Sequence, residues 1–358
     1  MRDIKGFTLE ELSEFCRQND FAGFRSQQIF NWLYQNLTAD PESMQNLPEE
    51  LQYWLRKNFN FTNLKEEKLT EAKDGTINIV YRLEDDKTIE TVLLPQTKGS
   101  KFTACLSTQV GCSLGCKFCA TGQQGYVRDL KAAEIVDQVW QGEKLLSAQE
   151  NLVDARNGIS GTRNIRNIVF MGMGEPLLNY NQLLKAVNIL RAPATFDIGS
   201  RRITISTVGI IPGIKKMAQD MPQVGLAISL HAADNKLRNK LIPLNKKYGL
   251  RELKAVLKDH QEITGRRVTI EYALIKGVND SQQQAKKLAR WLKGLKAFIN
   301  LIPLNPIEGS DLSGSNLTTI NSFKAELIKS GYSVKIRDSK GQEIKAACGQ
   351  LKQQEEAE

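Results

Sequence analysis

Long apolar runs are absent from this chain of 358 residues. Uninterrupted apolar stretches, such as residues 168–170, are far shorter than the roughly 20 residues that a membrane-spanning helix needs. Residues 1–12 also lack the apolar core of a secretory signal. These absences predict a cytoplasmic protein with no membrane association.

Histidine is scarce, with only His231 and His260, and cysteine is limited to six residues. Four of the cysteines fall between Cys105 and Cys119, which is not the spread of a disulfide framework in a small secreted domain. The proportions of hydrophobic (41%) and charged (25%) residues exclude a wholly disordered or fibrous chain. The clustered thiols therefore indicate a local chemical site in a globular protein.

Three of these cysteines, which we call the cysteine trio, have the spacing C-x3-C-x2-C at Cys112, Cys116 and Cys119. Three thiolates on one tight loop suit a [4Fe–4S] cluster with one iron left open for a further ligand. A zinc site would need a fourth ligand, which Cys105 would supply, so zinc is an alternative. A third interpretation is three small buried hydrophobic residues, which rarely cluster in this way.

Positive charge is in excess, since 49 Lys and Arg residues face 40 Asp and Glu residues, for a net charge of +9. Such an excess favours a polyanionic partner such as RNA. Bases are concentrated between residues 231 and 254, where they either neutralise phosphates or form a solvated helix face. These bases are Lys236, Arg238, Lys240, Lys246, Lys247, Arg251 and Lys254, and Arg201, Arg202, Arg266 and Arg267 add two basic pairs.

The hydrophobic periodicity predicts an α/β fold with an amino-terminal helical accessory domain over residues 1–60, whose third helix begins at Pro48. Residues 61–97 read as a small β extension, and six apolar runs then alternate with helical patterns. Because this alternation gives parallel strands with right-handed crossovers, we expect a partial (β/α)6 barrel over residues 98–340. Its strands are expected at residues 102–108, 167–171, 202–207, 224–230, 268–274 and 298–304, followed by a tail over residues 341–358 that carries Cys348.

Polar residues follow several expected strands at their carboxyl ends, where barrels of this kind carry their chemistry. Gly174 and Glu175 follow the second strand, where glycine lets a ligand approach and a carboxylate can pair with an ammonium group. Hydroxyl, imidazole and amide groups at later strand ends suit a nucleoside cofactor. Each of them alone is more often a cap or turn residue, so it is their common location at strand ends that favours the cofactor. These later residues are Ser206, Ser229, Leu230, His231 and Asn305.

Two further thiols lie outside the cysteine trio. Cys105 is on the first expected barrel strand, and Cys348 is in the closing segment, which we expect to be mobile. A mobile thiol and a second thiol near the cluster would form a nucleophile and its resolving partner. The alternative is two unrelated free cysteines.

Several motifs resemble one known family. The segment CSLGCKFC resembles the cluster loop of the radical S-adenosylmethionine (SAM) superfamily. The segment GMGE, after the second expected strand, stands where that superfamily has its GGE-like motif, but here Met173 separates the two glycines. The segments CxSTQVGCxxGCKFCATGxxG, GMGEPLLN, ISTVGIIPGI, LAISLHA, IPLNPI and AACGQL resemble the RlmN/Cfr family of RNA methyltransferases, over residues of about 24–351. The expected fold therefore resembles the radical SAM barrel.

This resemblance implies a role for each candidate residue. The cysteine trio would hold one [4Fe–4S] cluster, and two SAM molecules would be used per turnover. Cys348 would carry the methyl group as S-methylcysteine, Cys105 would resolve it through a transient disulfide, and Glu90 would accept a proton. The expected SAM contacts are Gly174, Glu175, Ser206, Ser229, Leu230, His231 and Asn305.

The resemblance also implies a reaction, the methylation of C2 of adenosine 2503 in 23S rRNA and of adenosine 37 in tRNAs. Radical chemistry suits this reaction because adenine C2 is electron-poor and cannot attack a methyl sulfonium. We expect a monomer that receives electrons from a donor such as flavodoxin and its reductase. Two alternatives stay open, namely a Cfr-type enzyme that methylates adenine C8 and a non-catalytic zinc-binding RNA protein.

Overall fold

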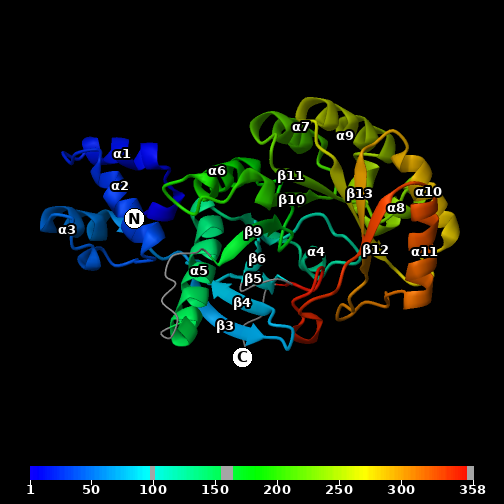
Figure 1. Ribbon diagram of the computed structural model, residues 1–358, viewed down its shortest axis with the longest axis horizontal. Helices are drawn as coiled ribbons and strands as arrows, with labels where there is room; N and C mark the ends of the chain where they lie inside the picture. Colours follow the sequence, from blue (N-terminus) through cyan, green and yellow to red (C-terminus); the bar gives the residue numbers. More distant parts are fainter. Residues whose placement is uncertain (97–100, 155–163, 353–358) are drawn as a thin grey trace.

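The computed structural model describes residues 1–96, 101–154 and 164–352, with side chains described as far as residue 148 in the middle segment. A ten-stranded sheet with the order β14-β13-β12-β11-β10-β9-β6-β5-β4-β3 organises the molecule (Figure 1). In this sheet, β6 and β9 to β14 are parallel, and β5, β4 and β3 continue the sheet in antiparallel fashion. The bounds are β3 (Lys65–Glu71), β4 (Ile77–Arg82), β5 (Thr88–Pro95), β6 (Phe102–Cys105), β9 (Ile165–Phe170), β10 (Ile203–Thr207), β11 (Gly225–Ser229), β12 (Val268–Leu274), β13 (Ala297–Pro303) and β14 (Ser333–Ile336).

Helices connect successive parallel strands, as crossover connections require. The six expected barrel strands correspond to β6 and β9 to β13, so the predicted parallel α/β arrangement is confirmed. A seventh parallel strand, β14, follows helix α11 and was not expected. The helices are α5 (Ala132–Asp154), α6 (Tyr180–Arg191), α7 (Ile211–Asp220), α8 (Asn235–Leu241), α9 (Leu250–Thr264), α10 (Gln282–Leu292) and α11 (Leu317–Lys329).

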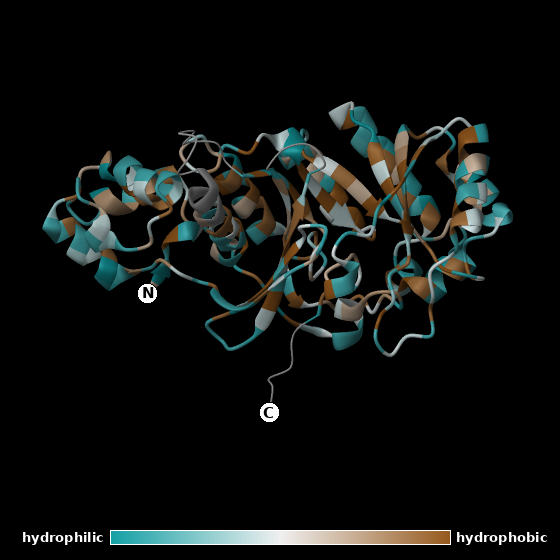
Figure 2. Ribbon diagram, turned by 60° about the horizontal axis from the view of Figure 1, so that its bottom comes forward, coloured by the Kyte–Doolittle hydropathy of each residue, from teal (hydrophilic) through white to brown (hydrophobic). Residues whose placement is uncertain are grey.

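Apolar side chains fill the space between the sheet and its helices. Ile228 on β11 pairs in register with Ile270 on β12, and both are fully buried, as is Leu288 on α10. Figure 2 shows that the central strands are mainly hydrophobic and that hydrophilic segments are frequent on the surrounding helices. Because parallel strands are covered on both faces, polar side chains that meet a ligand are expected at the strand ends.

The first sixty residues form a helical unit at one end of the molecule (Figure 1). Thr8 and Glu11 form a capping box at the start of α1. The third helix begins at Glu49, because Pro48 has an extended ψ of 145° and serves as the N-cap and not as the first helical residue. The unit contains α1 (Leu9–Arg17), α2 (Arg25–Phe30) and α3 (Glu49–Asn58), with β1 (Arg2–Asp3) paired to β2 (Phe59–Asn60).

A buried ion pair joins this helical unit to helix α5. The ammonium nitrogen of Lys5 lies 2.6 Å from Oδ1 of Asp137 and 2.6 Å from the carbonyl oxygen of Phe61. The other carboxylate oxygen of Asp137 accepts the backbone N–H groups of Asn63 and Leu64. Three chain segments, before α1, after β2 and on α5, therefore meet at one pair of charges.

The carboxyl-terminal segment packs beside the antiparallel strands (red in Figure 1). The backbone N–H of Lys73 donates to Glu343, and that of Gly341 donates to Asp74. The expected tail over residues 341–358 is described as far as Lys352, and residues 353–358 lie outside the described part of the chain. Among the described helices, none has both the length and the apolar character needed to cross a lipid bilayer.

Candidate active site

The cysteine trio lies on a loop that a two-stranded hairpin encloses. Gly111, at the start of the loop, has a φ of +73°, and a Cβ there would lie 2.0 Å from the carbonyl oxygen of Gly125. The backbone N–H of Cys112 donates to that same carbonyl at 2.7 Å. Glycine is therefore required where the hairpin closes the loop. The elements are β7 (Gln109–Gly111), α4 (Ala120–Gln124) and β8 (Tyr126–Asp129).

The three thiols influence one another's ionisation. Burial raises the pKa of Cys112 to about 12, and burial together with the other two thiols holds the pKa of Cys116 well above its usual range. Burial also raises the pKa of Cys119. Backbone N–H groups of Leu114 and Gly122 hydrogen-bond to the sulfur atoms of Cys112 and Cys119. Such a set of buried sulfur atoms with N–H donors fits an iron–sulfur cluster, which takes cysteines as thiolates.

Cys105 does not join this trio. It ends β6 instead, where the thiol of Cys348 is its electrostatic neighbour. Among the described residues, no three Cys, His, Asp or Glu side chains converge as the ligands of a single metal ion would. The thiolates of a [4Fe–4S] cluster bind separate irons and need no such convergence. The arrangement therefore does not favour a zinc site completed by Cys105.

The closing segment lies directly against the cluster loop. The backbone N–H of Ala120 donates to the carbonyl of Gly349 at 2.8 Å, and the hydroxyl of Thr121 donates to that of Leu351 at 2.5 Å. Asn305 Nδ2 donates to the carbonyl of Cys348 at 3.0 Å. The segment that we expected to be mobile is thus hydrogen-bonded to its neighbours at Cys348 and at Gly349 and Leu351 in this structure.

Cys105 and Cys348 form a second group of neighbouring thiols. Cys105 is 7% exposed, and burial, followed by the effect of Cys348, raises its pKa to about 12. The side chain of Cys348 is exposed at the surface but densely surrounded, and desolvation raises its pKa as well. All six cysteines, which lie in the described part of the chain, are free thiols. The structure therefore brings together the two thiols that the sequence singled out as a pair.

Glu90 connects the antiparallel strands to the closing segment. It lies on β5 and is only 2% exposed. Its Oε2 accepts a hydrogen bond from Asn78 Nδ2 at 2.6 Å, and its Oε1 accepts the backbone N–H of Lys352 at 3.0 Å. The carboxylate is therefore tied to the chain four residues after Cys348, in the same region as the two thiols.

The carboxylate of Glu175 is held by backbone groups of its own loop and of the segment after β10. Its two oxygens accept the backbone N–H groups of Leu177 at 3.1 Å and Val208 at 3.0 Å. Burial raises the pKa of Glu175 to about 7, so the protonated form is populated near neutral pH. The preceding Gly174 has a φ of +97°, and a Cβ there would lie 2.5 Å from the Cβ of Gln109. Contact with β7 thus requires this glycine, whereas sequence reasoning attributed it to the approach of a ligand.

The candidate residues on β10 and β11 lie together at the strand ends. The hydroxyl oxygens of Ser206 and Ser229 are 3.2 Å apart, and Leu230 is fully buried. His231 has a left-handed φ of 54°, and its Nδ1 accepts the backbone N–H of Ala273 at 2.8 Å. Burial, helped by a nearby arginine, lowers the pKa of His231 to about 3. The ring is therefore neutral and carries its proton on Nε2.

Asn305, after β13, provides an open acceptor at this site. Its Nδ2 is engaged by the Cys348 carbonyl, but its buried Oδ1 has no hydrogen-bond partner among the described residues. A buried amide oxygen without a partner costs free energy, and a ligand donor would remove that cost. The amino group or a ribose hydroxyl of SAM would supply such a donor, so the strand-end residues fit this cofactor.

Sequence reasoning missed a polar group inside the sheet. Glu271 on β12 accepts a hydrogen bond from Asn300 on β13 at 2.8 Å, and burial raises the pKa of Glu271. Arg337, just after β14, lowers the pKa of Glu271 and that of Cys348. An acidic residue within the apolar strand pattern VTIEYAL was the signal that could have identified it.

The basic residues divide into three groups, and two of these correct the sequence interpretation. Arg238 is buried, so it is not a surface contact for phosphate. Arg201, Arg202, Arg266 and Arg267 precede β10 and β12, which places them at the amino ends of the parallel strands, away from the candidate site. The bases that follow β11 at the site end are Lys236, Lys240, Lys246, Lys247 and Arg251, which are exposed, and Lys254, which is half-buried.

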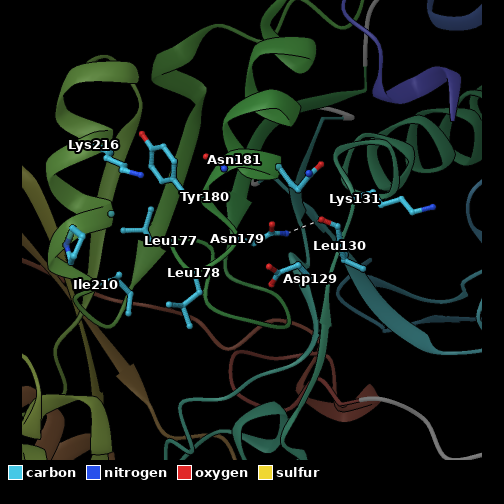
Figure 3. A pocket seen from close by; sticks show the side chains of 13 residues that line it. Asp129, Leu130, Lys131, Leu177, Leu178, Asn179, Tyr180, Asn181, Ile210 and Lys216 are labelled. Carbon is cyan, nitrogen blue, oxygen red and sulfur yellow. Dashed lines mark hydrogen bonds between the residues drawn. The ribbon is translucent and has the colours of Figure 1, made fainter. Parts of the chain in front are cut away.

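A cavity of about 500 Å³ lies beside the candidate site (Figure 3). It is lined by the end of β8 and by the segments after β9 and β10, where Asn179 Nδ2 donates to the carbonyl of Leu130 at 2.8 Å. Lys216 and Tyr180 also line this cavity, and the Lys216 Nζ lies 5.5 Å from the centroid of the Tyr180 ring. None of the candidate cofactor residues is among its described lining residues.

Comparisons with known proteins agree with this geometry. Residues 2–61 match the family model described as "Ribosomal RNA large subunit methyltransferase N-terminal domain", and residues 106–289 match that of the radical SAM superfamily. A protein of Syntrophomonas wolfei named "Probable dual-specificity RNA methyltransferase RlmN" is 44% identical, covering 98% of this chain and 97% of that protein.

Two further relatives extend the match. The "Dual-specificity RNA methyltransferase RlmN" of Nautilia profundicola is 41% identical over 97% of this chain and 96% of its own length. A crystal structure of a radical SAM methyltransferase from Sphaerobacter thermophilus superposes with a TM-score of 0.91 at 41% identity, covering 98% of this chain and 99% of the other. With both domains matched along nearly the whole length, the chain belongs to the RlmN family of radical SAM RNA methyltransferases.

Proposed function

We propose that this chain methylates C2 of adenosine 2503 in 23S rRNA and C2 of adenosine 37 in tRNAs. The observation that carries the proposal is the meeting of Cys105, Cys348 and the Glu90-bound closing segment beside the cluster loop. A radical SAM enzyme that only cleaves SAM has no need of two thiols at this place. The dual-specificity names of the relatives support rRNA and tRNA as substrates.

The cofactors of this proposal are one [4Fe–4S] cluster and SAM. The cysteine trio supplies three thiolates, and the strand ends around Ser206, Ser229 and Asn305 supply polar contacts for SAM. When bound, this pair of cofactors provides a carbon radical that can remove a hydrogen atom from a methyl group. Two SAM molecules per turnover follow, because one supplies the methyl carbon and the other supplies the radical.

The chain's own residues carry the methyl carbon and release the product. The Cys348 thiolate would take the methyl group from one SAM, with S-adenosylhomocysteine as the leaving group. After this methyl group has lost a hydrogen atom, the sulfur-bound carbon radical would add to C2 of adenine. Glu90, whose Oε1 accepts the Lys352 backbone N–H at 3.0 Å, would accept the proton that leaves C2. The adduct gives up one electron together with the C2 proton, and a cluster held by the cysteine trio would be the electron acceptor. Cys105 would then attack the sulfur of Cys348 and break the sulfur–carbon bond. The released carbon would take a proton and become the methyl group of the product, and a disulfide would remain between the two cysteines.

The RNA would approach the strand-end edge of the barrel. Lys117 on the cluster loop is exposed there, and its backbone N–H donates to the carbonyl of Leu241 at the end of α8. The exposed bases after β11 lie on the same side and would contact phosphates, so binding would weaken with salt. The target adenosine would have to leave its stack to reach Cys348.

The same proposal covers the domain roles and the cellular setting. Residues 1–60 form an accessory unit for RNA contact, residues 61–97 a β extension, residues 98–340 the catalytic core, and residues 341–358 the tail with Cys348. The enzyme acts as a cytoplasmic monomer and receives electrons from a donor of the flavodoxin type.

Nucleoside mass spectrometry tests this function. The enzyme is reconstituted with iron and sulfide without oxygen and incubated with SAM, a reductant and unmodified 23S rRNA or tRNA. We expect 2-methyladenosine at the two positions with the wild-type chain and none with Cys348→Ala. A main product of 8-methyladenosine would instead assign the Cfr-type reaction, and a colourless protein that holds zinc but no iron would refute the enzyme.

A further inference from the structure

A buried guanidinium that has no carboxylate partner in the described part of the chain lies beside the cluster loop. Arg238, on helix α8, is 1% exposed. Its Nε donates to the carbonyl of Leu230 at 3.0 Å, and its Nη1 donates to Asn245 Oδ1 at 2.8 Å. Its Nη2 donates to the carbonyl of Val208 at 2.5 Å and to that of Ser229 at 3.4 Å. All four acceptors are neutral oxygen atoms.

This arrangement satisfies the hydrogen bonds of the cation but not its charge. Among the described residues, no carboxylate lies within 4.0 Å of Arg238. Buried arginines are normally paired with an anion, because an isolated charge in the protein interior is costly. The geometry therefore indicates that an anion of the working enzyme balances this charge.

The cluster loop adjoins the helix that carries Arg238 and offers a place for such an anion. The backbone N–H of Lys117 donates to the carbonyl of Leu241 at 3.0 Å, which joins the loop to the end of α8. Cys116 packs in one apolar cluster with Leu241 and Ile242. Cys116 is also the one group that raises the pKa of Arg238 against the lowering effect of burial, so the cation and this thiol are electrostatic neighbours.

A cluster held by three thiolates would supply the missing charge. Three thiolates on a [4Fe–4S] core of charge +2 give a net charge of −1, and one-electron reduction makes it −2 without any proton uptake. A fixed cation at this place stabilises both states and stabilises the reduced state more. The guanidinium is also anchored to the ends of β10 and β11, so it cannot move away to solvent.

We propose that Arg238 is the buried countercharge of the iron–sulfur cluster and raises its reduction potential. This inference rests on the proposed function, because it requires the cysteine trio to hold a [4Fe–4S] cluster. Arg238 acts here as a positioning residue through its charge, and it touches neither the RNA nor the reacting carbon.

Redox titration of the reconstituted holoenzyme, followed by electron paramagnetic resonance of the reduced cluster, tests the proposal without any assay of methylation. In Arg238→Gln, we expect the ratio of reduced to oxidised cluster at a fixed solution potential to fall about tenfold. A tenfold change is equivalent to about 59 mV for a one-electron couple. In Arg238→Lys, which keeps the charge, we expect the ratio to stay within about threefold of the wild type.

A charge on the exposed face of the same helix serves as the matched control. Lys240→Gln removes one positive charge from α8 where solvent screens it, so the ratio should stay near the wild-type value. Because Arg238→Gln also loses hydrogen bonds, iron content is measured for each variant. If Arg238→Gln loses its iron and Arg238→Lys keeps a normal iron content, the result supports the inference, because the cluster then needs a positive charge at position 238.

Three results would overturn the inference. The first is an Arg238→Gln enzyme with full iron and an unchanged potential. The second is equal loss of iron in both Arg238 variants, which would assign the residue to bracing the strand ends. The third is an Arg238→Gln enzyme whose reduction potential differs from that of the wild type only after SAM is added. That result would make the SAM carboxylate, and not the cluster, the partner of Arg238. Failure of the wild-type chain to bind a cluster would refute the proposed function instead.

Discussion

Replacement of Lys5 by methionine tests how the amino-terminal helical unit is held to the barrel. Lys5 and Asp137 have fully buried side chains, and 2.6 Å separates their charged atoms. The ammonium group also lies 3.9 Å from the ring centroid of Trp140. In Lys5→Met, the carboxylate of Asp137 keeps two backbone N–H donors but loses the one cation that pairs with it among the described residues, so a buried charge is left uncompensated.

The expected cost is about 3–5 kcal/mol, as for other buried pairs broken on one side. Native-state hydrogen exchange is the suitable assay, because a chain with two units need not unfold in one step. A loss of about 3 kcal/mol corresponds to roughly a 100-fold rise in the opening constant. We expect the opening constants of the backbone amides in residues 1–64 to rise by this factor, and those of the amides in strands β10 to β12 to change little.

The control is Lys131→Met, since the Lys131 side chain is 57% exposed and pairs with Asp3 at the surface. The Lys131→Met substitution should change the free energy of opening by no more than about 0.5 kcal/mol. Adding Asp137→Asn to Lys5→Met should restore part of the loss, because the lone buried charge is then removed. Equal exchange rates in Lys5→Met and Lys131→Met would refute the view that this pair joins the two units.

The other predictions concern the site. Cys105→Ala should trap a covalent adduct between RNA and Cys348, visible as a shifted band on denaturing gels; Cys105→Ala/Cys348→Ala should give none, and a single variant without the band would contradict the resolving role. The pKa of Glu175 is raised in the folded state to about 7, so the folded chain binds a proton that the unfolded chain releases above its ordinary pKa. Between about pH 4.5 and 7, stability of the apo-protein should therefore fall as pH rises, by up to about 3 kcal/mol, and thermal unfolding of Glu175→Gln should lack this slope. Gly111→Ala places a Cβ 2.0 Å from the Gly125 carbonyl and should lose most of its iron on reconstitution; normal iron content would show that the hairpin tolerates the side chain.

Local patterns account for what the sequence predicted well. Strands β10 to β13 were expected within a few residues of their observed bounds, because a buried parallel strand needs a nearly continuous apolar run. The cysteine trio could be predicted as a candidate cluster site in the same way, since its three thiols belong to one loop and their spacing is read directly. Pro48 was misplaced by one position, because cap and first helical turn differ only in backbone angles.

Long-range contacts decided the remainder. The spacing of bases along the chain could not show that Arg238 turns inward or that Arg201 and Arg266 stand at the amino ends of the strands. The sequence pattern also could not show that the closing segment lies on the cluster loop. This packing brings Cys348 close to Cys105, although the two residues are 243 positions apart in the chain. Residue type and spacing determine local structure and the chemistry that a loop can offer. Which side chains are buried, and which distant groups meet, depends on the packing of the whole chain, and only the tertiary structure decides it.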